Sequence, residues 1–421
     1  MADDRLHHEN TGRPNGLGTA RHTDSGFRSE PLATSGSLVL DPDLQAKARQ
    51  YAGLRRRMAF VSLGTGAVYL VLWISNDWGP GLSEALESAT WGAHGAGLAW
   101  WVEVLVVAGV LGAPWGLINL PLDYYIGFVL PHRFQLSTQS RAGWLADVAK
   151  GTLLSILLGS PLLVALYSIM RATPDRWWLW SAIGFSGVSI ALSAVAPVLL
   201  MPIFFKFRPL DEVHSELNAR LLELARRSGT PVRGVFTFDM SRRTRAANAA
   251  LVGLGRTRRI ILGDTLLSEF NVDEIETVLA HELGHHVHAD IPLLIAAQSG
   301  VTLVSFFLVA QTAAWLFPYL GLASIADPGG VPAVTLLLGA TSLAGVPFAN
   351  AFSRWRETLA DDYSVRLTRN PSAFAQALIR LANQNLAEAE PPWWAVLLLS
   401  SHPPLGHRIR RAVGRIGTGV E

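Results

Sequence analysis

Long apolar runs alternate with shorter polar or basic ones over most of the chain. A helix needs about 20 apolar residues to cross a lipid bilayer. Six stretches meet this requirement or come close to it, namely residues 58–75, 97–122, 151–170, 177–205, 291–326 and 331–353. The fifth is long enough that we expect a turn near residues 318–321. The pattern therefore predicts a mainly α, polytopic helical membrane protein with about six spans.

The basic residues between these stretches predict which way the spans run. Lys and Arg gather before the first span, between the second and third spans, over residues 206–290, and after residue 353. The connections at 76–96 and 327–330 contain neither. Segments on the cytoplasmic side of a membrane are enriched in Lys and Arg. We therefore expect both termini, and the basic segments, to face the cytoplasm.

Residues 206–290 and 354–421 remain to build a soluble part. Runs at 234–240, 246–252 and 259–262 are β-rich and separated by turn residues, which predicts a small three-stranded sheet. We divide the chain into a disordered polar tail (1–43), an N-terminal membrane region with four spans (44–205), and a domain at 206–421 that includes two further spans. The tail contains the pair His7–His8, for which a solvated tail is the favoured interpretation.

A helix that starts just before the fifth span carries the first candidate chemistry. Asn271 as N-cap and Glu274 three residues later form a capping box, and we expect the helix to run through His288 toward the span. Two residues on it, His281 and His285, are four apart and share one face, so both imidazoles can reach one ion. A polar helix face with a paired histidine is the structural alternative.

The residue after the first histidine, Glu282, completes the HExxH pattern of zinc proteases, in which this carboxylate is the general base. Catalytic zinc takes three protein ligands and leaves one position open. After the sixth span Glu357 can supply the third ligand, and Asp361 shares its helical face and can orient a ligand imidazole. The extra histidines at 286 and 288 are expected at the surface or behind the ligands. The prediction is one zinc ion per chain.

Composition narrows the chemistry further. Of 421 residues, 50% are hydrophobic and only 16% are charged, against about 25% in soluble proteins. There is no cysteine, which excludes disulfides, thiolate metal ligands and cysteine nucleophiles. A metal site must therefore use His and carboxylates. The net charge of +2 gives no indication of nucleic acid, and we expect none as a partner.

Several separate blocks, in order, make the chain resemble the type I CAAX prenyl protease family of membrane gluzincins. The resemblance covers roughly residues 44–413, through blocks at 113–119, 134–138, 241–267, 280–285, 357–361 and 401–405. It implies a gluzincin-type zinc peptidase domain with His281, His285 and Glu357 as ligands and Glu282 as the base. An HVHAD sequence at 286–290 replaces the Trp and Gly-His that often follow the family's metal helix, and the eukaryotic extra span and acidic insertion have no counterpart. These differences suggest a bacterial relative.

The resemblance also implies roles for residues outside the metal motifs. Asn248 and Ala249 resemble the strand that pairs with an extended substrate, a mode in which a peptide adds to a sheet edge. His402 resembles a donor to the oxyanion of the tetrahedral intermediate, its structural alternative being a helix-start residue before Pro403. Arg408 is implied in substrate binding.

The sequence thus predicts a membrane-embedded zinc metalloendopeptidase whose partners are polypeptides and the lipid bilayer. We expect membrane-associated, misfolded or C-terminally lipidated substrates, a bacterial plasma membrane, and an active site that faces the cytoplasm. One alternative is a heat-shock-type membrane quality-control metalloprotease. The other is a non-catalytic membrane scaffold or transporter with a relict metal site, in which Glu103 would mark a solute path.

Overall fold

In the part of the chain that the structure describes, six helical stretches are long and apolar enough to span a membrane, as the sequence predicts. The structure is a computed structural model that describes residues 38–94, 99–253 and 255–416, so His7, His8 and most of the predicted tail lie outside the described residues. The candidate spans comprise α1 (Pro42–Ser75), α3 to α4 (Trp100–Tyr124 and Leu130–Arg133), α5 (Arg141–Ala172), α6 to α7 (Trp177–Val195 and Met201–Phe204), α11 (Asp290–Leu316) and α12 (Val331–Thr368).

Several of these helices extend well beyond the apolar runs that predicted them. The helix α1 begins at Pro42 rather than near residue 58, because Asp41 caps it by accepting hydrogen bonds from the backbone N–H groups of Asp43 and Leu44. The predicted connection at 76–96 contains a further helix, α2 (Trp78–His94). The turn expected near 318–321 is present, with Gly321 at a φ of 66° that favours glycine.

The soluble part is built on a small mixed sheet of four strands, not three. The strands β1 (Phe207–Pro209), β2 (Val235–Phe238), β3 (Ala249–Val252) and β4 (Arg259–Gly263) lie in the order β1-β2-β4-β3. The parallel pair β2 and β4 is central, and the outer strands run antiparallel to it. The sequence does not reveal β1 because three residues ending in proline carry no alternating pattern. At the other edge β3 pairs only with β4 among the described residues.

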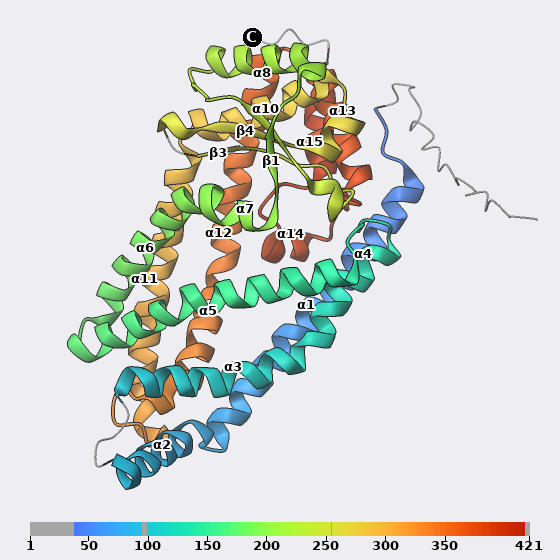
Figure 1. Ribbon diagram of the computed structural model, residues 1–421. Helices are drawn as coiled ribbons and strands as arrows, with labels where there is room; N and C mark the ends of the chain where they lie inside the picture. Colours follow the sequence, from blue (N-terminus) through green and yellow to red (C-terminus); the bar gives the residue numbers. More distant parts are fainter. Residues whose placement is uncertain (1–37, 95–98, 254, 417–421) are drawn as a thin grey trace, which may run out of the picture. The chain divides into compact units, whose positions relative to one another are not determined.

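Five shorter helices complete this part, namely α8 (Ser215–Arg227), α9 (Asp264–Glu269), α13 (Pro371–Gln384), α14 (Trp393–Leu399) and α15 (Leu405–Val413). Together with α10 (Val272–Val287), the sheet, α8, α13 and α15 gather at one end of the long helices (Figure 1). A core formed by α8, the sheet, α10 and α13 contains fully buried Leu221, Ile260 and Leu279. A separate core joins the spans around Tyr167 and Val309.

The helix α10 starts as predicted but ends earlier. Asn271 and Glu274 form both hydrogen bonds of the capping box. The prediction that the helix runs through His288 into the fifth span is wrong, since α10 ends at Val287 and α11 starts afresh at Asp290. Between them Ala289 has a left-handed φ of 53°, a conformation that costs a non-glycine residue about 1–2 kcal/mol. This break redirects the chain beside the predicted ligands.

The helices α10 and α12 approach each other closely within the HExxH motif. A Cβ atom on Gly284 would lie 3.0 Å from Ala360 Cα and 3.2 Å from Ala360 O, so only glycine fits there without displacement. One turn further along α12, the hydroxyl of Ser364 donates to the Thr277 carbonyl at 2.7 Å, and both residues are buried. This packing fixes the distance between the face of α10 and the face of α12 that carry the candidate ligands.

Candidate metal centre

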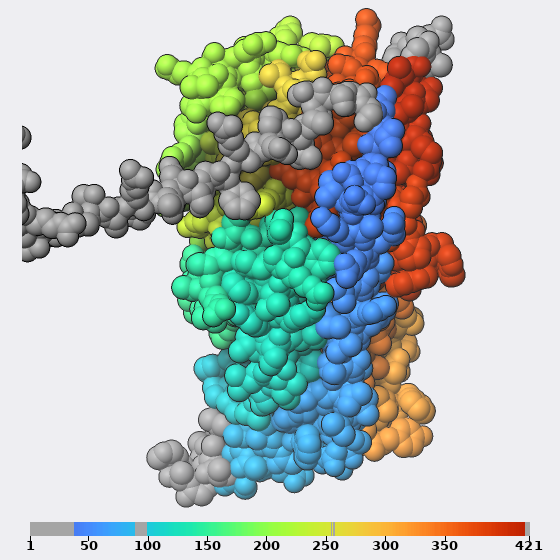
Figure 2. Space-filling model, turned by 90° about the vertical axis from the view of Figure 1, so that its right-hand side faces the viewer, coloured from blue at the N-terminus to red at the C-terminus, as the bar shows by residue number. Residues whose placement is uncertain are grey.

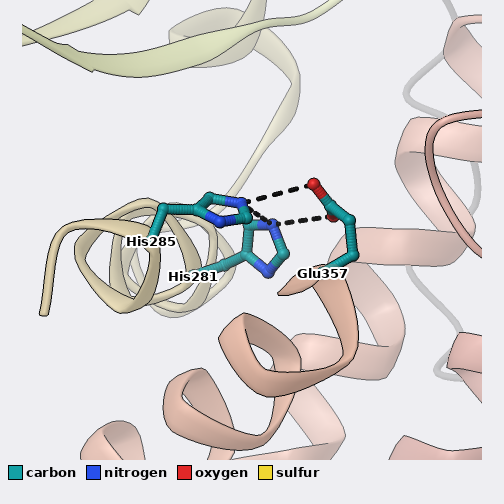
Figure 3. A group of neighbouring side chains, drawn as sticks. All are labelled: His281, His285 and Glu357. Atoms are coloured by element: carbon teal, nitrogen blue, oxygen red, sulfur yellow. Dashed lines mark hydrogen bonds and ion pairs between the residues drawn. The ribbon is translucent and has the colours of Figure 1, made fainter. Parts of the chain in front are cut away.

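Three side chains predicted as metal ligands converge from two helices. His281 and His285 project from α10 and Glu357 from α12 (Figure 3). One potential ligand atom from each residue lies within 4.8 Å of the other two. The Nε2 atoms of the two histidines are 3.1 Å apart, and each lies near one oxygen of Glu357, at 3.3 Å for His281 and 3.4 Å for His285.

The charges around these atoms favour a cation between them. The carboxylate oxygen Oε2 of Glu357 is buried and accepts no hydrogen bond among the described residues. Burial alone would lower the pKa of His281, but the neighbouring carboxylates of Asp361 and Glu357 raise the pKa of His281 to about 9. Two imidazole nitrogens and a carboxylate oxygen that accepts no hydrogen bond are a donor set that suits zinc. The residues present therefore fit a zinc ion.

The first histidine is held by a carboxylate from α12. The Nδ1 atom of His281 lies 2.9 Å from Asp361 Oδ1. Arg408, in α15, donates to both oxygens of Asp361, from Nε at 2.8 Å and from Nη2 at 2.6 Å. All three side chains are buried. Such a carboxylate fixes the ring orientation and leaves Nε2 free for a metal, which is the part that the sequence predicted for Asp361.

The second histidine is held in the same way by a residue that the sequence analysis missed. Asp290 accepts a hydrogen bond at 2.7 Å from Nδ1 of His285 and is 1% exposed. Arg356 donates to Asp290 from Nε at 2.5 Å and to the carbonyl of His288 at 2.8 Å. The only signal in the sequence is an acid directly after the metal helix, at the start of an apolar span.

The candidate base, Glu282, directly follows His281 on α10 and is partly buried. Burial raises the pKa of Glu282, an effect that the neighbouring His281 and His285 oppose. A carboxylate with a raised pKa holds an abstracted proton better than an ordinary surface glutamate, which suits a general base.

His402 approaches the same centre from the C-terminal segment. Its Nε2 atom lies 3.2 Å from Glu357 Oε1, and its Nδ1 atom lies 2.9 Å from the hydroxyl of Ser401. The side chain of His402 is 62% exposed, so one side of the centre is open. The structure thus brings together every residue of the two metal motifs, and His402 with them.

The residues with predicted substrate roles fall into two groups. Asn248 is exposed and immediately precedes β3, and Ala249 is the first residue of that edge strand, which packs against α10. Arg408 is different, because it is buried behind Asp361 and reaches no closer than 3.9 Å to Glu357. His286 is partly exposed, and the ring of His288 packs edge-on against Tyr363 at 5.6 Å.

A paired-histidine helix and a glutamate at one end of a bundle of membrane-spanning helices define a membrane metallopeptidase. Comparisons agree: the family model of peptidase family M48 matches residues 211–416, and that of the CAAX prenyl protease N-terminal region, described as five membrane helices, matches residues 30–206. The CAAX prenyl protease 1 homolog of Oryza sativa subsp. japonica is 31% identical over 72% of this chain and 71% of its own length.

Two further relatives extend over nearly the whole chain. The metalloprotease YhfN of Bacillus subtilis (strain 168) is 28% identical over 92% of this chain and 91% of its own. The crystal structure of S. mikatae Ste24p matches with a TM-score of 0.78 and 25% identity, over 91% of this chain and 92% of that one. The chain therefore belongs to peptidase family M48, with the CAAX prenyl protease 1 homologues, and is a multi-pass integral membrane metallopeptidase.

Proposed function

We propose that the chain binds one zinc ion through His281, His285 and Glu357 and hydrolyses peptide bonds beside it. The convergence of these three side chains within 4.8 Å supports the proposal most directly. Zinc, when bound, polarises the scissile carbonyl and lowers the pKa of a water molecule. The protein's own part is to hold the imidazoles in place and to move protons.

Proton transfer is assigned to Glu282. Its carboxylate takes the proton from the attacking water and delivers it to the departing amine, and its raised pKa supports both halves of this transfer. Asp361 Oδ1 lies 2.9 Å from Nδ1 of His281, and Asp290 accepts a hydrogen bond from Nδ1 of His285, so each carboxylate holds an imidazole with its Nε2 atom turned toward the other ligands. His402, which is exposed beside Glu357, donates to the developing oxyanion.

The substrate binds as an added strand. The exposed Asn248 and the outer edge of β3, which pairs with no further strand among the described residues, support antiparallel or parallel pairing with an extended peptide. Arg408 contributes by holding Asp361, because its guanidinium is buried. The polypeptides cleaved are those associated with the membrane, including C-terminally lipidated ones, as the names of the CAAX prenyl protease 1 relatives suggest.

Exchange of the base for its amide tests this function. We expect Glu282→Gln to lower kcat by about 100-fold to 10,000-fold, because an amide cannot accept the proton. The substrates are unfolded casein and a farnesylated C-terminal peptide with its unfarnesylated twin, all offered to protein reconstituted in vesicles. Metal analysis should still find one zinc per chain. Turnover near that of the unchanged protein would refute the role of Glu282, and preference for the farnesylated twin would establish the lipidated substrate.

The site's location is also a proposal, namely a bacterial plasma membrane with the centre on the cytoplasmic side. The Arg-rich segments on the side of the centre support it. The chain has no cysteine, so Ser268→Cys and Ser324→Cys, both at exposed positions, provide clean reporters. In intact cells an impermeant maleimide should label position 324 and spare position 268. Labelling of position 268 from outside would reverse the proposed orientation.

A further inference from the structure

The short helix α14 exposes a concentration of large apolar side chains close to the candidate centre. Trp393 is 76% exposed, and Leu397, Leu398 and Leu399 are between 38% and 48% exposed. No charged residue lies between Glu390 and His402. Exposed apolar patches of this kind mark an interaction surface on a protein.

Two spans independently place α14 at the boundary between membrane and water. The ring of Trp394, in α14, contacts two residues of α1. It lies 5.8 Å from the guanidinium of Arg56 and 6.0 Å from the ring of Phe60. Arg56 belongs to the basic triplet that ends just before the apolar part of α1 begins. The contact therefore lies where the helix changes from charged to apolar. Figure 2 shows the red C-terminal part of the chain beside the blue α1.

The contacts of α14 with the other span, α12, place it at the same boundary. Its side chains donate to three carbonyls of α14 and the following residue: Asn350 Nδ2 to Leu398 at 3.1 Å, and Arg354 Nη1 to Val396 at 2.8 Å and to Ser400 at 2.7 Å. Arg354 is the first charged residue after the uncharged part of α12 that begins at Val331. The last four carbonyls of a helix have no partner within it. These donors let the end of α14 lie in a region of low polarity.

We propose that α14 docks onto the lipid bilayer, at the boundary between headgroups and hydrocarbon of the leaflet nearest the metal centre. Tryptophan prefers this boundary, and the exposed leucines fit the outer hydrocarbon below it. Lipid is the partner because the neighbouring candidate spans also expose large apolar side chains, namely Phe60, whose ring contacts Trp394, and Phe348, which are 46% and 74% exposed.

The docked helix α14 positions the segment at residues 400–402, which ends in His402. Only Ser401 separates Ser400, whose carbonyl Arg354 holds, from His402 at the centre. Arg354 has no carboxylate within ion-pair distance among the described residues, and its guanidinium donates instead to the carbonyls of Val396 and Ser400. The segment is therefore fixed between lipid on one side and Arg354 on the other. Arg354 is a positioning residue for His402, and this half of the inference rests on the proposed role of His402.

Spin labels on the cysteine-free chain test the docking without reference to catalysis. Labels are placed through Leu398→Cys and Trp393→Cys, with Phe348→Cys as the lipid-facing control and Val213→Cys, at an 88% exposed position of the soluble part, as the aqueous control. In vesicles of phosphatidylethanolamine and phosphatidylglycerol, the ratio of collisions with oxygen to collisions with a water-soluble nickel chelate is measured. Positions 393 and 398 should resemble 348. A ratio like that of 213 at both positions would overturn the proposal.

The positioning half is tested by kinetics in the same vesicles, with casein as substrate. Leu398→Glu should lower kcat about ten- to 100-fold with little change in KM, because a misplacement of about 1 Å can cost 100-fold. Leu398→Met, which stays apolar, and Val213→Glu should keep the original kcat. Arg354→Gln should act like Leu398→Glu. Zinc content should not change in any of them.

The loss of kcat in Leu398→Glu and Arg354→Gln should disappear when His402 is already absent. In a His402→Ala background, Leu398→Glu and Arg354→Gln should cost less than twofold more. Equal losses in both backgrounds would show that α14 does not act through His402. If His402→Ala itself leaves kcat unchanged, the proposed oxyanion role and the positioning half are both wrong, while the labels still decide whether α14 docks on lipid.

Discussion

Each of the two histidines of the proposed centre is held by a carboxylate that an arginine binds in turn, but the two carboxylate–arginine pairs come from different parts of the fold. Behind His281 stand Asp361 on α12 and Arg408 on α15. Behind His285 stand Asp290, only five residues along the chain, and Arg356 on α12. The first arrangement needs three separate helices to pack correctly. The second is completed mainly by the turn between α10 and α11.

This difference has physical consequences. The side chain of His281 is 9% exposed, whereas that of His285 is 22% exposed, so water reaches the second histidine more readily. The arrangement at His281 also touches the third ligand, since Arg408 Nη1 lies 3.9 Å from Glu357 Oε2. In both, a buried carboxylate is matched by a buried guanidinium, which removes the cost of an isolated internal charge. The helix α12 contributes to both arrangements and carries Glu357 between its two contributions.

The largest effect on zinc binding is expected at Glu357, the ligand that lies close to both histidines. Glu357→Ala should abolish stoichiometric zinc binding, because two histidines alone leave the ion with too few protein ligands. Both imidazoles keep their carboxylates in this variant, so the loss isolates the shared ligand. Metal content after dialysis, measured by mass spectrometry, checks the result. Full zinc occupancy would assign the third ligand elsewhere, with His402 the nearest remaining donor.

The contrast also explains what the sequence could reveal of the site. Asp361 follows Glu357 by four residues in an unbroken helix, so the spacing alone puts both on one face. Asp290 follows His285 by five residues, and in a continuous helix it would point about 140° away. Only the left-handed Ala289 brings it back beside the ring. Arg356 and Arg408 could not be paired with their acids, because helical spacing does not determine which elements pack together.

The elements of the fold likewise divide into those that the sequence could predict and those that it could not. The six spans were predictable because apolar length is a property of each segment by itself. The capping box at Asn271 was predictable for the same reason, since it involves only four consecutive residues. The strand β1 and the end of α10 were not, because a three-residue strand exists only by pairing with β2 and the break at Ala289 depends on what Asp290 contacts. The proposed boundaries of the three domains stay a prediction.

A pair of matched variants tests the comparison at the carboxylates themselves. Asp361→Asn and Asp290→Asn should each weaken zinc binding about 10- to 100-fold, the usual range for a group that orients a ligand histidine. Asp361→Asn should lie at the upper end, because water cannot easily compensate for the lost negative charge at the more buried His281. Competition with a coloured chelator measures both affinities. A larger loss for Asp290→Asn would show that exposure does not rank the two.

The smallest effect on zinc binding is expected for the two arginines that bind these carboxylates, Arg408 and Arg356. Arg408→Lys and Arg356→Lys keep the positive charge but lose the planar fork that binds two acceptors at once. Each should lower the free energy of unfolding by about 1.5–3 kcal/mol, the value of a hydrogen bond to a charged group. Zinc affinity should fall less than about tenfold, below the range for the carboxylates.

Between the two arginines, Arg408→Lys should cost more zinc affinity, because Arg408 approaches the ligand Glu357 as well as Asp361. Arg356 divides its donors between Asp290 and the His288 carbonyl and reaches no ligand. Its loss should therefore appear mainly in stability, through the turn that contains Ala289. Chelator competition and denaturant unfolding, run on both variants, separate the two quantities. If Arg356→Lys weakened zinc binding more than Arg408→Lys, the turn between α10 and α11 would control the centre more strongly than the three-helix arrangement at His281.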